Sequence, residues 1–214
     1  MLGQSISRNS LLLGAFASFT TLLIAGTYLQ TKDKIAIEER KAEEKALLQI
    51  VPDSRHNNSM LDDTIMVDES NVELGLRTQK NIYLARQNGR AVAAIIPVTA
   101  RDGYSGDVNL IVGVNVDGTI AGVRALSHRE TPGLGDKVDL KKSDWILGFN
   151  GKSLVNPTLA RWTVKKDEGE FDQFTGATIT PRAVVAATLR ALQYAQANKT
   201  AIFADEQVPK EVEK

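Results

Sequence analysis

A run of 23 residues without a charged side chain lies between Arg8 and Lys32. Its sequence, NSLLLGAFASFTTLLIAGTYLQT, is mostly apolar. As a helix that rises about 1.5 Å per residue, it would reach across the roughly 30 Å of a bilayer core. Tyr28 lies near one end, where an aromatic side chain at the membrane interface is expected. We therefore predict a transmembrane helix over residues 9–31, preceded by a short segment, residues 1–8.

A cleaved signal peptide is the alternative for the same run. It requires a shorter apolar stretch followed by a cleavage site with the pattern small-x-small. Ile24-Ala25-Gly26 matches that pattern poorly, so we favour an uncleaved anchor. Charge alone would keep the C-terminal side of the span inside, although this rule is weak for long domains. Arg8 and the amino terminus precede the span, and the basic residues that follow it are Lys32, Lys34, Arg40, Lys41 and Lys45.

Acidic and basic residues alternate from residue 32 to residue 51 around an interrupted apolar stripe, which predicts a helix with a solvated face. The polar stretch at residues 53–60 then indicates a boundary. We predict a membrane-proximal helix and linker over residues 32–60, one domain over 61–200 and a charged tail over 201–214.

Two β-hairpins form the clearest pattern within that domain. Residues 82–87 and 90–98 flank Asn88-Gly89, a pair that supplies the positive φ angles of a type I′ turn. Residues 108–116 and 119–126 flank Asp117-Gly118 in the same way. Four antiparallel strands in series predict a meander with one buried face, which a C-terminal helix can cover. The expected fold class is therefore α+β, with one domain of ordinary length after an N-terminal helix.

The overall composition excludes several kinds of chemistry. The 26 basic residues balance the 26 acidic ones, so no basic excess exists to replace the counterions of a nucleic acid. Cysteine is absent, which excludes disulfides, thiolate catalysis and iron–sulfur ligation by this chain. The only imidazoles are His56 and His128, far apart in sequence, so we expect no metal site. A chain of this composition that carries electrons needs an organic carrier.

The stretch FDQFTGATITPRAVVAATLRALQYAQA, residues 171–197, joins a hydroxyl-rich loop to a helix with one broad apolar face. Thr180 followed by Pro181 predicts the helix start, with the threonine as cap. Thr175 and Thr178 would then lie just before the helix N-terminus, where free N–H groups and the helix dipole favour an anion such as phosphate.

The segment Asp172-Gln-Phe-Thr-Gly-Ala-Thr178 resembles the flavin-attachment motif of a known family, and Glu130-Thr-Pro-Gly-Leu-Gly135 matches that family residue for residue. The family is that of the G subunits of Rnf/Rsx electron-transport complexes, and the chain is more distantly similar to the C subunits of sodium-pumping NADH:quinone oxidoreductases. The resemblance implies that FMN is esterified through its phosphate to Thr178. It also implies that the glycine loop lies near the flavin. The site residues that we expect from it are Thr178, Thr175, Gly176, Ala177, Asp172, Glu130, Thr131, Pro132, Gly133, Leu134, Gly135 and Tyr104.

The resemblance further implies a location and partners. It places the chain in the bacterial inner membrane as a single-pass protein, with a cytoplasmic N-terminus and a periplasmic FMN-binding domain. The expected partners are the other integral-membrane subunits of the complex and a flavin transferase. The chain would be an electron-carrying subunit of an ion-translocating oxidoreductase that passes electrons between ferredoxin and NAD, and not an enzyme on its own. It carries no Gly-x-Gly-x-x-Gly motif for direct oxidation of NADH.

Several segments near the site have simpler explanations. The loop Asp102–Gly106 can be an ordinary turn, Trp162 can be a core residue instead of a stacking partner for flavin, and residues 161–166 can form a fifth strand. Residues 143–149 predict a short capped helix that places Trp145 in the core. Without a bound flavin, the domain would be an anchored sensor that binds a small anion, or a scaffold subunit.

Overall fold

The computed structural model describes residues 2–204. Most of the predicted charged tail, residues 205–214, lies outside this range. The chain divides into two compact units, one up to Glu43 and one from Glu44 onward. We describe each unit by itself. The predicted boundaries at residues 32 and 60 stay predictions.

The first unit is helical. The helix α1 (Leu2–Leu48) contains the whole uncharged run and continues into the second unit. Its part from Arg8 to Leu48 is long and apolar enough to cross a membrane. Threonine hydroxyls within it donate to backbone carbonyls one turn earlier, from Thr27 to Leu23 at 2.8 Å and from Thr31 to Thr27 at 2.8 Å. These bonds satisfy polar groups that would be costly to leave unpaired in a hydrocarbon environment.

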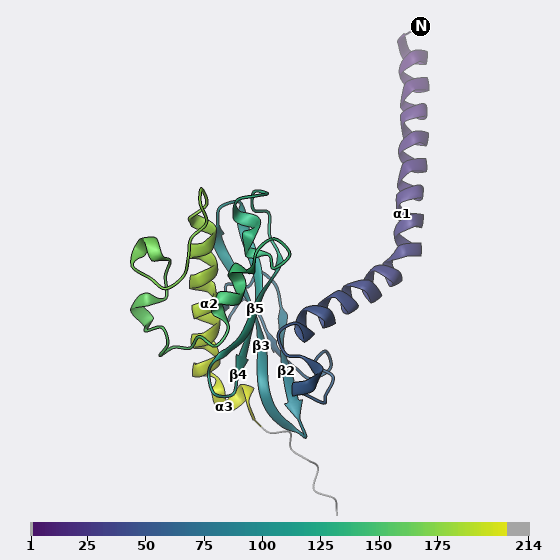
Figure 1. The fold of residues 1–214 in the computed structure, drawn as a ribbon. Helices are drawn as coiled ribbons and strands as arrows, with labels where there is room; N and C mark the ends of the chain where they lie inside the picture. The colour runs from purple at the N-terminus through teal and green to yellow at the C-terminus, as the bar shows by residue number, and fades with distance from the viewer. Residues whose placement is uncertain (1, 205–214) are drawn as a thin grey trace, which may run out of the picture. The chain divides into compact units, whose positions relative to one another are not determined.

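The second unit is built on an antiparallel sheet whose five strands lie in chain order. Figure 1 shows these strands as a meander with α2 across one face. The predicted α+β class and four of the strands are confirmed, whereas the edge strand β1 was not predicted. The strands are β1 (Thr64–Val67), β2 (Lys80–Gln87), β3 (Arg90–Gly103), β4 (Gly106–Asn115) and β5 (Ile120–Ser127).

Each of the two predicted hairpin turns contains a glycine with a positive φ angle. Asn88 and Gly89 have φ angles of 54° and 77°, as the type I′ prediction requires. In the β4–β5 turn only Gly118 has a positive φ, of 86°, and the Asp117 carboxylate accepts the Thr119 N–H at 2.9 Å. This second turn is longer because it closes through the Asn115 N–H and the Thr119 carbonyl at 2.8 Å.

The helix α2 (Ile179–Ala197) covers one face of the sheet and packs mainly on β3 and β4. Its buried residues recur at helical spacing, and they meet side chains that alternate along the strands. Val184, Ala187 and Ala191 are fully buried there against Ile96 and Val112. The predicted covering of this face by a C-terminal helix is therefore confirmed. A short helix, α3 (Lys199–Ile202), follows it.

The opposite face of the sheet is also covered, which the sequence analysis did not predict. Leu47, Ile50, Val51 and Met60 are buried against it, together with strand residues that include Ile95. The apolar stripe at the end of the charged helical stretch is thus part of the core, whereas the charged residues at positions 40–45 are exposed, as predicted. Ile50 lies directly over Gly113, where a Cβ atom would collide with the Ile50 Cγ2 atom. Glycine is therefore required at this position of β4.

The segment between β5 and α2 contains short 3₁₀ turns around an aromatic cluster. Phe149, Trp162 and Phe171 are buried, and the Phe149 and Phe171 ring centroids are 4.6 Å apart. The predicted fifth strand at residues 161–166 is wrong: only a single bridge joins Val164 to Phe171. The 3₁₀ turns of the unit are Asp53–Arg55, Val72–Leu74, Gly135–Val138, Asp144–Phe149, Leu159–Arg161 and Lys165–Asp167.

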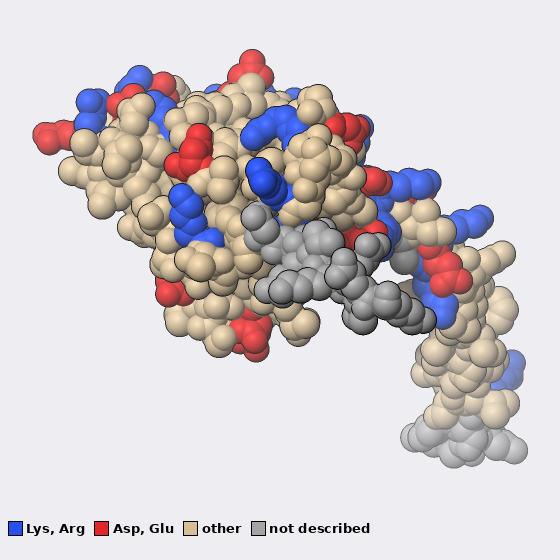
Figure 2. Space-filling model, turned by 90° about the horizontal axis from the view of Figure 1, so that it is seen from below, with Lys and Arg blue, Asp and Glu red and all other residues tan. Residues whose placement is uncertain are grey.

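The predicted cap at Ser143 is confirmed, since its hydroxyl accepts the Trp145 N–H at 3.2 Å. Trp145 itself is only partly buried, at the edge of the core and not inside it. Trp162 is buried, and its indole N–H donates to the Ser153 carbonyl at 3.1 Å, so it is a core residue. On the face that Figure 2 shows, basic and acidic side chains are interspersed among uncharged ones.

Candidate functional site

The helix α2 begins two residues earlier than the threonine–proline pair predicts. Ile179 is the first helical residue and Thr178 is the N-cap, with φ −92° and ψ −26° and no capping bond from its side chain. The predicted capping role of Thr180 is therefore wrong. Thr180 is fully buried within the first turn, and its hydroxyl donates to the Glu130 Oε2 atom at 2.5 Å. The Thr180 hydroxyl is therefore bonded to a buried carboxylate and does not cap the helix end.

The threonine loop before α2 is a tight turn. The Ala177 N–H donates to the Phe174 carbonyl at 3.1 Å, and Gly176 has a φ of 81°. A positive φ at the third residue of a β-turn favours glycine. Thr175 stands at the exposed corner of this turn, whereas Thr178 is half-buried at its end. The two hydroxyls therefore have different surroundings, although they are only three residues apart.

A cavity of about 440 Å³ opens at this turn. Three chain segments form it: the β3–β4 turn, the glycine loop after β5, and the threonine loop with the first turn of α2. Its volume falls within the range that small-molecule sites occupy. The lining residues are Tyr104, Glu130, Thr131, Leu134, Gly135, Gly176, Ala177, Thr178, Ile179 and Thr180.

Most of the residues that we expected in the site therefore lie around one cavity. Four of the expected residues do not line it: Asp172, Thr175, Pro132 and Gly133. Ile179, 45% exposed, lines it and was not predicted; its position directly after Thr178 is the signal in the sequence that could have indicated it. The Asp102–Gly106 loop is the β3–β4 turn, and it also brings Tyr104, 68% exposed, to the cavity.

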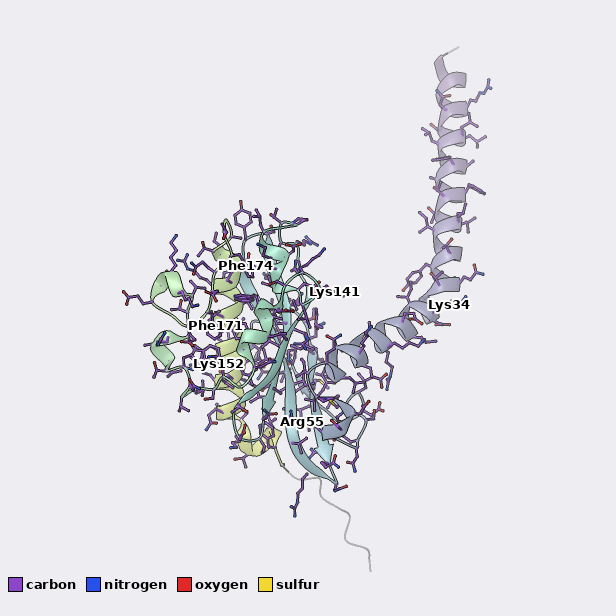
Figure 3. The ribbon with its side chains drawn as sticks, in the orientation of Figure 1. Lys34, Arg55, Lys141, Lys152, Phe171 and Phe174 are labelled. Atoms are coloured by element: carbon purple, nitrogen blue, oxygen red, sulfur yellow. The ribbon has the colours of Figure 1, made fainter. Side chains whose placement is uncertain are left out.

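Asp172 lies outside the cavity, at a second hollow that Trp145 and Phe171 also line. Its carboxylate is exposed and 2.8 Å from the Lys165 ammonium, and its carbonyl accepts the Trp145 indole N–H at 2.7 Å. Phe171 directly before it in the sequence and Phe174 two residues after it are both buried; Figure 3 labels these two side chains. The aromatic cluster therefore fixes the loop, and Asp172 is left accessible to another protein.

Pro132 and Gly133 form the bend of the glycine loop. The Leu134 N–H donates to the Thr131 carbonyl at 3.1 Å, and Gly133 has a φ of 78°. Both residues are exposed, whereas Leu134 reaches towards the threonine loop. A Cβ atom on Gly176 would lie 3.4 Å from the Leu134 Cδ2 atom. The role of this bend is to direct Leu134 and Gly135 to the cavity.

One ion pair braces the first turn of α2 from outside the cavity. The Arg182 guanidinium donates two hydrogen bonds of 2.6 Å to the Asp167 carboxylate. These bonds lower the pKa of Asp167 and raise the pKa of Arg182. Because the pKa of Asp167 is lowered in the folded state, the pair stabilises the fold above the ordinary pKa of aspartate. This stabilisation is lost as the pH falls through the lowered pKa. The pair is exposed, so its contribution is small.

No group of three potential metal-ligating side chains occurs within residues 2–204. The His56 ring is bonded to the Asn58 carbonyl at 3.0 Å, and the His128 Nδ1 atom accepts the Glu130 N–H at 3.2 Å. Both rings therefore have structural roles next to the backbone.

Comparison with known proteins identifies the family. Residues 103–193 match the FMN-binding domain family, and residues 1–50 match the RnfG N-terminal region. The chain is 48% identical to the G subunit of the ion-translocating oxidoreductase complex from Pseudoalteromonas atlantica, over 94% of this chain and 93% of that protein. It is 46% identical to the protein of the same name from Pseudomonas aeruginosa, over 95% of each chain.

Among solved structures, Shewanella oneidensis NqrC is similar with a TM-score of 0.43 and 23% identity, over 66% of each chain. The C subunit of the Na⁺-translocating NADH-quinone reductase from Parabacteroides distasonis is similar with a TM-score of 0.44 and 18% identity. That match covers 67% of this chain and 79% of the other. The identity of nearly half with the two G subunits, over almost the whole chain, shows that this protein belongs to the family of G subunits of ion-translocating oxidoreductase complexes.

Proposed function

We propose that this protein is a membrane-anchored electron carrier in which FMN is joined covalently, through its phosphate, to the Thr178 hydroxyl. The observation that carries the proposal is the position of Thr178. It ends the segment that resembles a flavin-attachment motif, it lies at the N-terminus of α2, and it lines the cavity. A helix N-terminus favours a phosphate, and Leu134, Tyr104 and Ile179 provide apolar surface for an aromatic ring.

Among the residues that line the cavity, none is a base free to activate Thr178. Around the cavity, Glu130 is the acidic group, and both of its oxygens already accept bonds from the protein. We therefore propose that a separate flavin transferase performs the attachment and recognises the exposed Asp172 and Thr175. In that reaction the threonine oxygen forms a bond to phosphorus and gives up its proton to a base of the transferase, while the leaving group of an activated flavin phosphate departs with the electrons of its bond to phosphorus. The product is heavier by one FMN less one water.

A covalent link serves retention of the cofactor. A non-covalent site empties when the free ligand is scarce, whereas a tether keeps the ligand at high effective concentration. The bound flavin would supply the redox chemistry, while this chain positions it and limits the access of water. Within an ion-translocating complex, the chain would then accept electrons from one subunit and pass them to another. We propose that the complex links ferredoxin and NAD.

The experiment that tests the proposal is an intact-mass measurement on the chain co-expressed with a flavin transferase. We expect one added FMN with the loss of one water, and yellow colour that remains with the denatured chain. A chain of unmodified mass from cells that flavinylate another target would contradict the proposal. It would favour a domain that binds a small anion reversibly.

We also propose that the FMN-binding domain faces the periplasm. The chain contains no cysteine, so a single introduced cysteine is a unique label. Val155, 83% exposed in the domain, and Gln4, before the apolar run, are suitable positions. We expect a membrane-impermeant maleimide to label Val155→Cys in intact spheroplasts, and Gln4→Cys only after permeabilisation. The reverse pattern would place the domain in the cytoplasm.

A further inference from the structure

A buried carboxylate connects the walls of the cavity. Glu130 is only 5% exposed. Its Oε1 atom accepts the Ser105 N–H at 3.0 Å, and its Oε2 atom accepts the Thr180 hydroxyl at 2.5 Å. A distance this short between two oxygens is typical of a hydroxyl that donates to a charged carboxylate. Ser105 belongs to the β3–β4 turn and Thr180 to α2, while Glu130 itself begins the glycine loop.

Two glycines leave room for this carboxylate. A Cβ atom on Gly135 would lie 2.6 Å from the Glu130 Oε2 atom and 2.9 Å from the Thr180 Oγ1 atom. A Cβ atom on Gly103 would lie 2.9 Å from the Glu130 Oε1 atom. Side chains at either position would therefore displace the carboxylate or its partners. The glycines come from two different walls, so both walls are shaped around the same group.

We propose that Glu130 is the positioning residue of the flavin site. Its carboxylate holds the first turn of α2, and therefore Thr178, against the other two walls. Its negative charge, at the edge of the same cavity, also opposes the addition of electrons to a bound flavin. This inference rests on the proposed function of Thr178, but the bonds of Glu130 can be tested without any flavin.

Two variants distinguish the effect of the Glu130 charge from the effect of its hydrogen bonds to Ser105 and Thr180, which we call the connection. In Glu130→Gln the amide oxygen can still accept from Ser105 and the amide N–H can donate to Thr180, so the connection is retained while the charge is lost. We expect the attached flavin of this variant to have a more positive midpoint potential. At an effective dielectric constant of about 20, a charge about 12 Å from the flavin ring changes the equilibrium constant of reduction by roughly tenfold. This corresponds to about 59 mV for a one-electron couple.

Thr180→Val has the complementary effect, because it removes the hydroxyl donor and keeps the charge. We expect flavin attachment, followed by intact mass over time, to slow severalfold. Thr180→Ser keeps a hydroxyl and is the matched control, in which attachment should return to the wild-type rate. A midpoint potential of Glu130→Gln equal to that of the wild type would overturn the role of the charge. Wild-type attachment in Thr180→Val would overturn the role of the connection.

A flavin-independent measurement distinguishes failure of this inference from failure of the proposed function. In the full chain carrying Thr178→Val, the Ser105 amide should exchange its hydrogen slowly because Glu130 accepts it. Adding Glu130→Ala should speed that exchange severalfold, whereas amides in β3 should be unchanged. Equal exchange at Ser105 in both chains would reject the connection. A wild-type chain without flavin would reject the attachment alone.

Discussion

Thr178→Val is expected to give a folded protein that carries no flavin through denaturing electrophoresis. Valine has nearly the shape of threonine but has no hydroxyl to bond to phosphorus. The Thr178 side chain makes no capping bond at the helix end, so its hydroxyl contributes little to folding. We expect the melting temperature of the unmodified chain to change little, since such substitutions usually stay within about 0.5 kcal/mol. In-gel fluorescence and intact mass would report the loss of the cofactor.

Thr175→Val is the matched control. Thr175 has the same side chain three residues earlier, but it is exposed at the corner of the turn and lies outside the cavity. We expect this variant to retain a covalent flavin, with slower attachment if the transferase contacts the hydroxyl. Fluorescence retained in Thr178→Val and lost in Thr175→Val would move the attachment site to Thr175.

The hairpins and the last long helix could be predicted because their signals are local. Asn88-Gly89 specifies its own backbone geometry, and the apolar periodicity of residues 184–195 specifies a face without reference to any partner. By contrast, β1 has four residues with an exposed edge, which is too short for a clear alternation. The strand predicted at residues 161–166 failed because its buried tryptophan packs on Phe149 and Phe171 instead of pairing in the sheet.

The covering of the second face of the sheet depends on contacts between residues far apart in the sequence, which local patterns do not predict. Leu47 and Ile50 follow a charged helical stretch. The sequence of that stretch does not predict that Ile50 packs on Gly113. The two positions are far apart in the sequence and meet only when β4 has formed. The same reason explains why Thr180 does not cap the helix as predicted. A threonine before a proline is a good helix cap, and only the folded chain brings the Glu130 carboxylate to it.

The site shows how a linear motif divides its tasks. From Thr175 to Thr178 the chain first forms a turn and then reaches the cavity, so neighbouring residues of one motif differ in whether they face solvent or line the cavity. In the glycine loop, Pro132 and Gly133 make the bend while Leu134 and Gly135 line the cavity. The resemblance to a known family was enough to identify these two segments as parts of the site. The distinction between forming the turn and lining the site required the three-dimensional arrangement.

Among the substitutions named here, Phe149→Ala is expected to lower the free energy of unfolding most. Phe149 is fully buried, with ring centroids 4.6 Å from Phe171 and 5.4 Å from Trp145. Truncation of a buried phenylalanine to alanine costs about 3–5 kcal/mol, because the cavity that it leaves closes only partly. For a domain of this size, the melting temperature falls by roughly 2–4 °C per kcal/mol. Both tryptophans of the chain lie in this cluster, so their fluorescence reports its unfolding directly.

Val155→Ala is the control for Phe149→Ala, since Val155 is 83% exposed and its truncation should change the melting temperature little. Phe149 also stacks on Phe171, which begins the threonine loop, so the variant should loosen the segment that we propose a transferase recognises. We expect flavin attachment to fall already at temperatures where the variant is still folded. If attachment instead stayed normal until the tryptophan signal melted, the aromatic cluster would stabilise the domain without presenting the loop. The exposed position of Asp172 would then depend on its own contacts with Lys165 and Trp145.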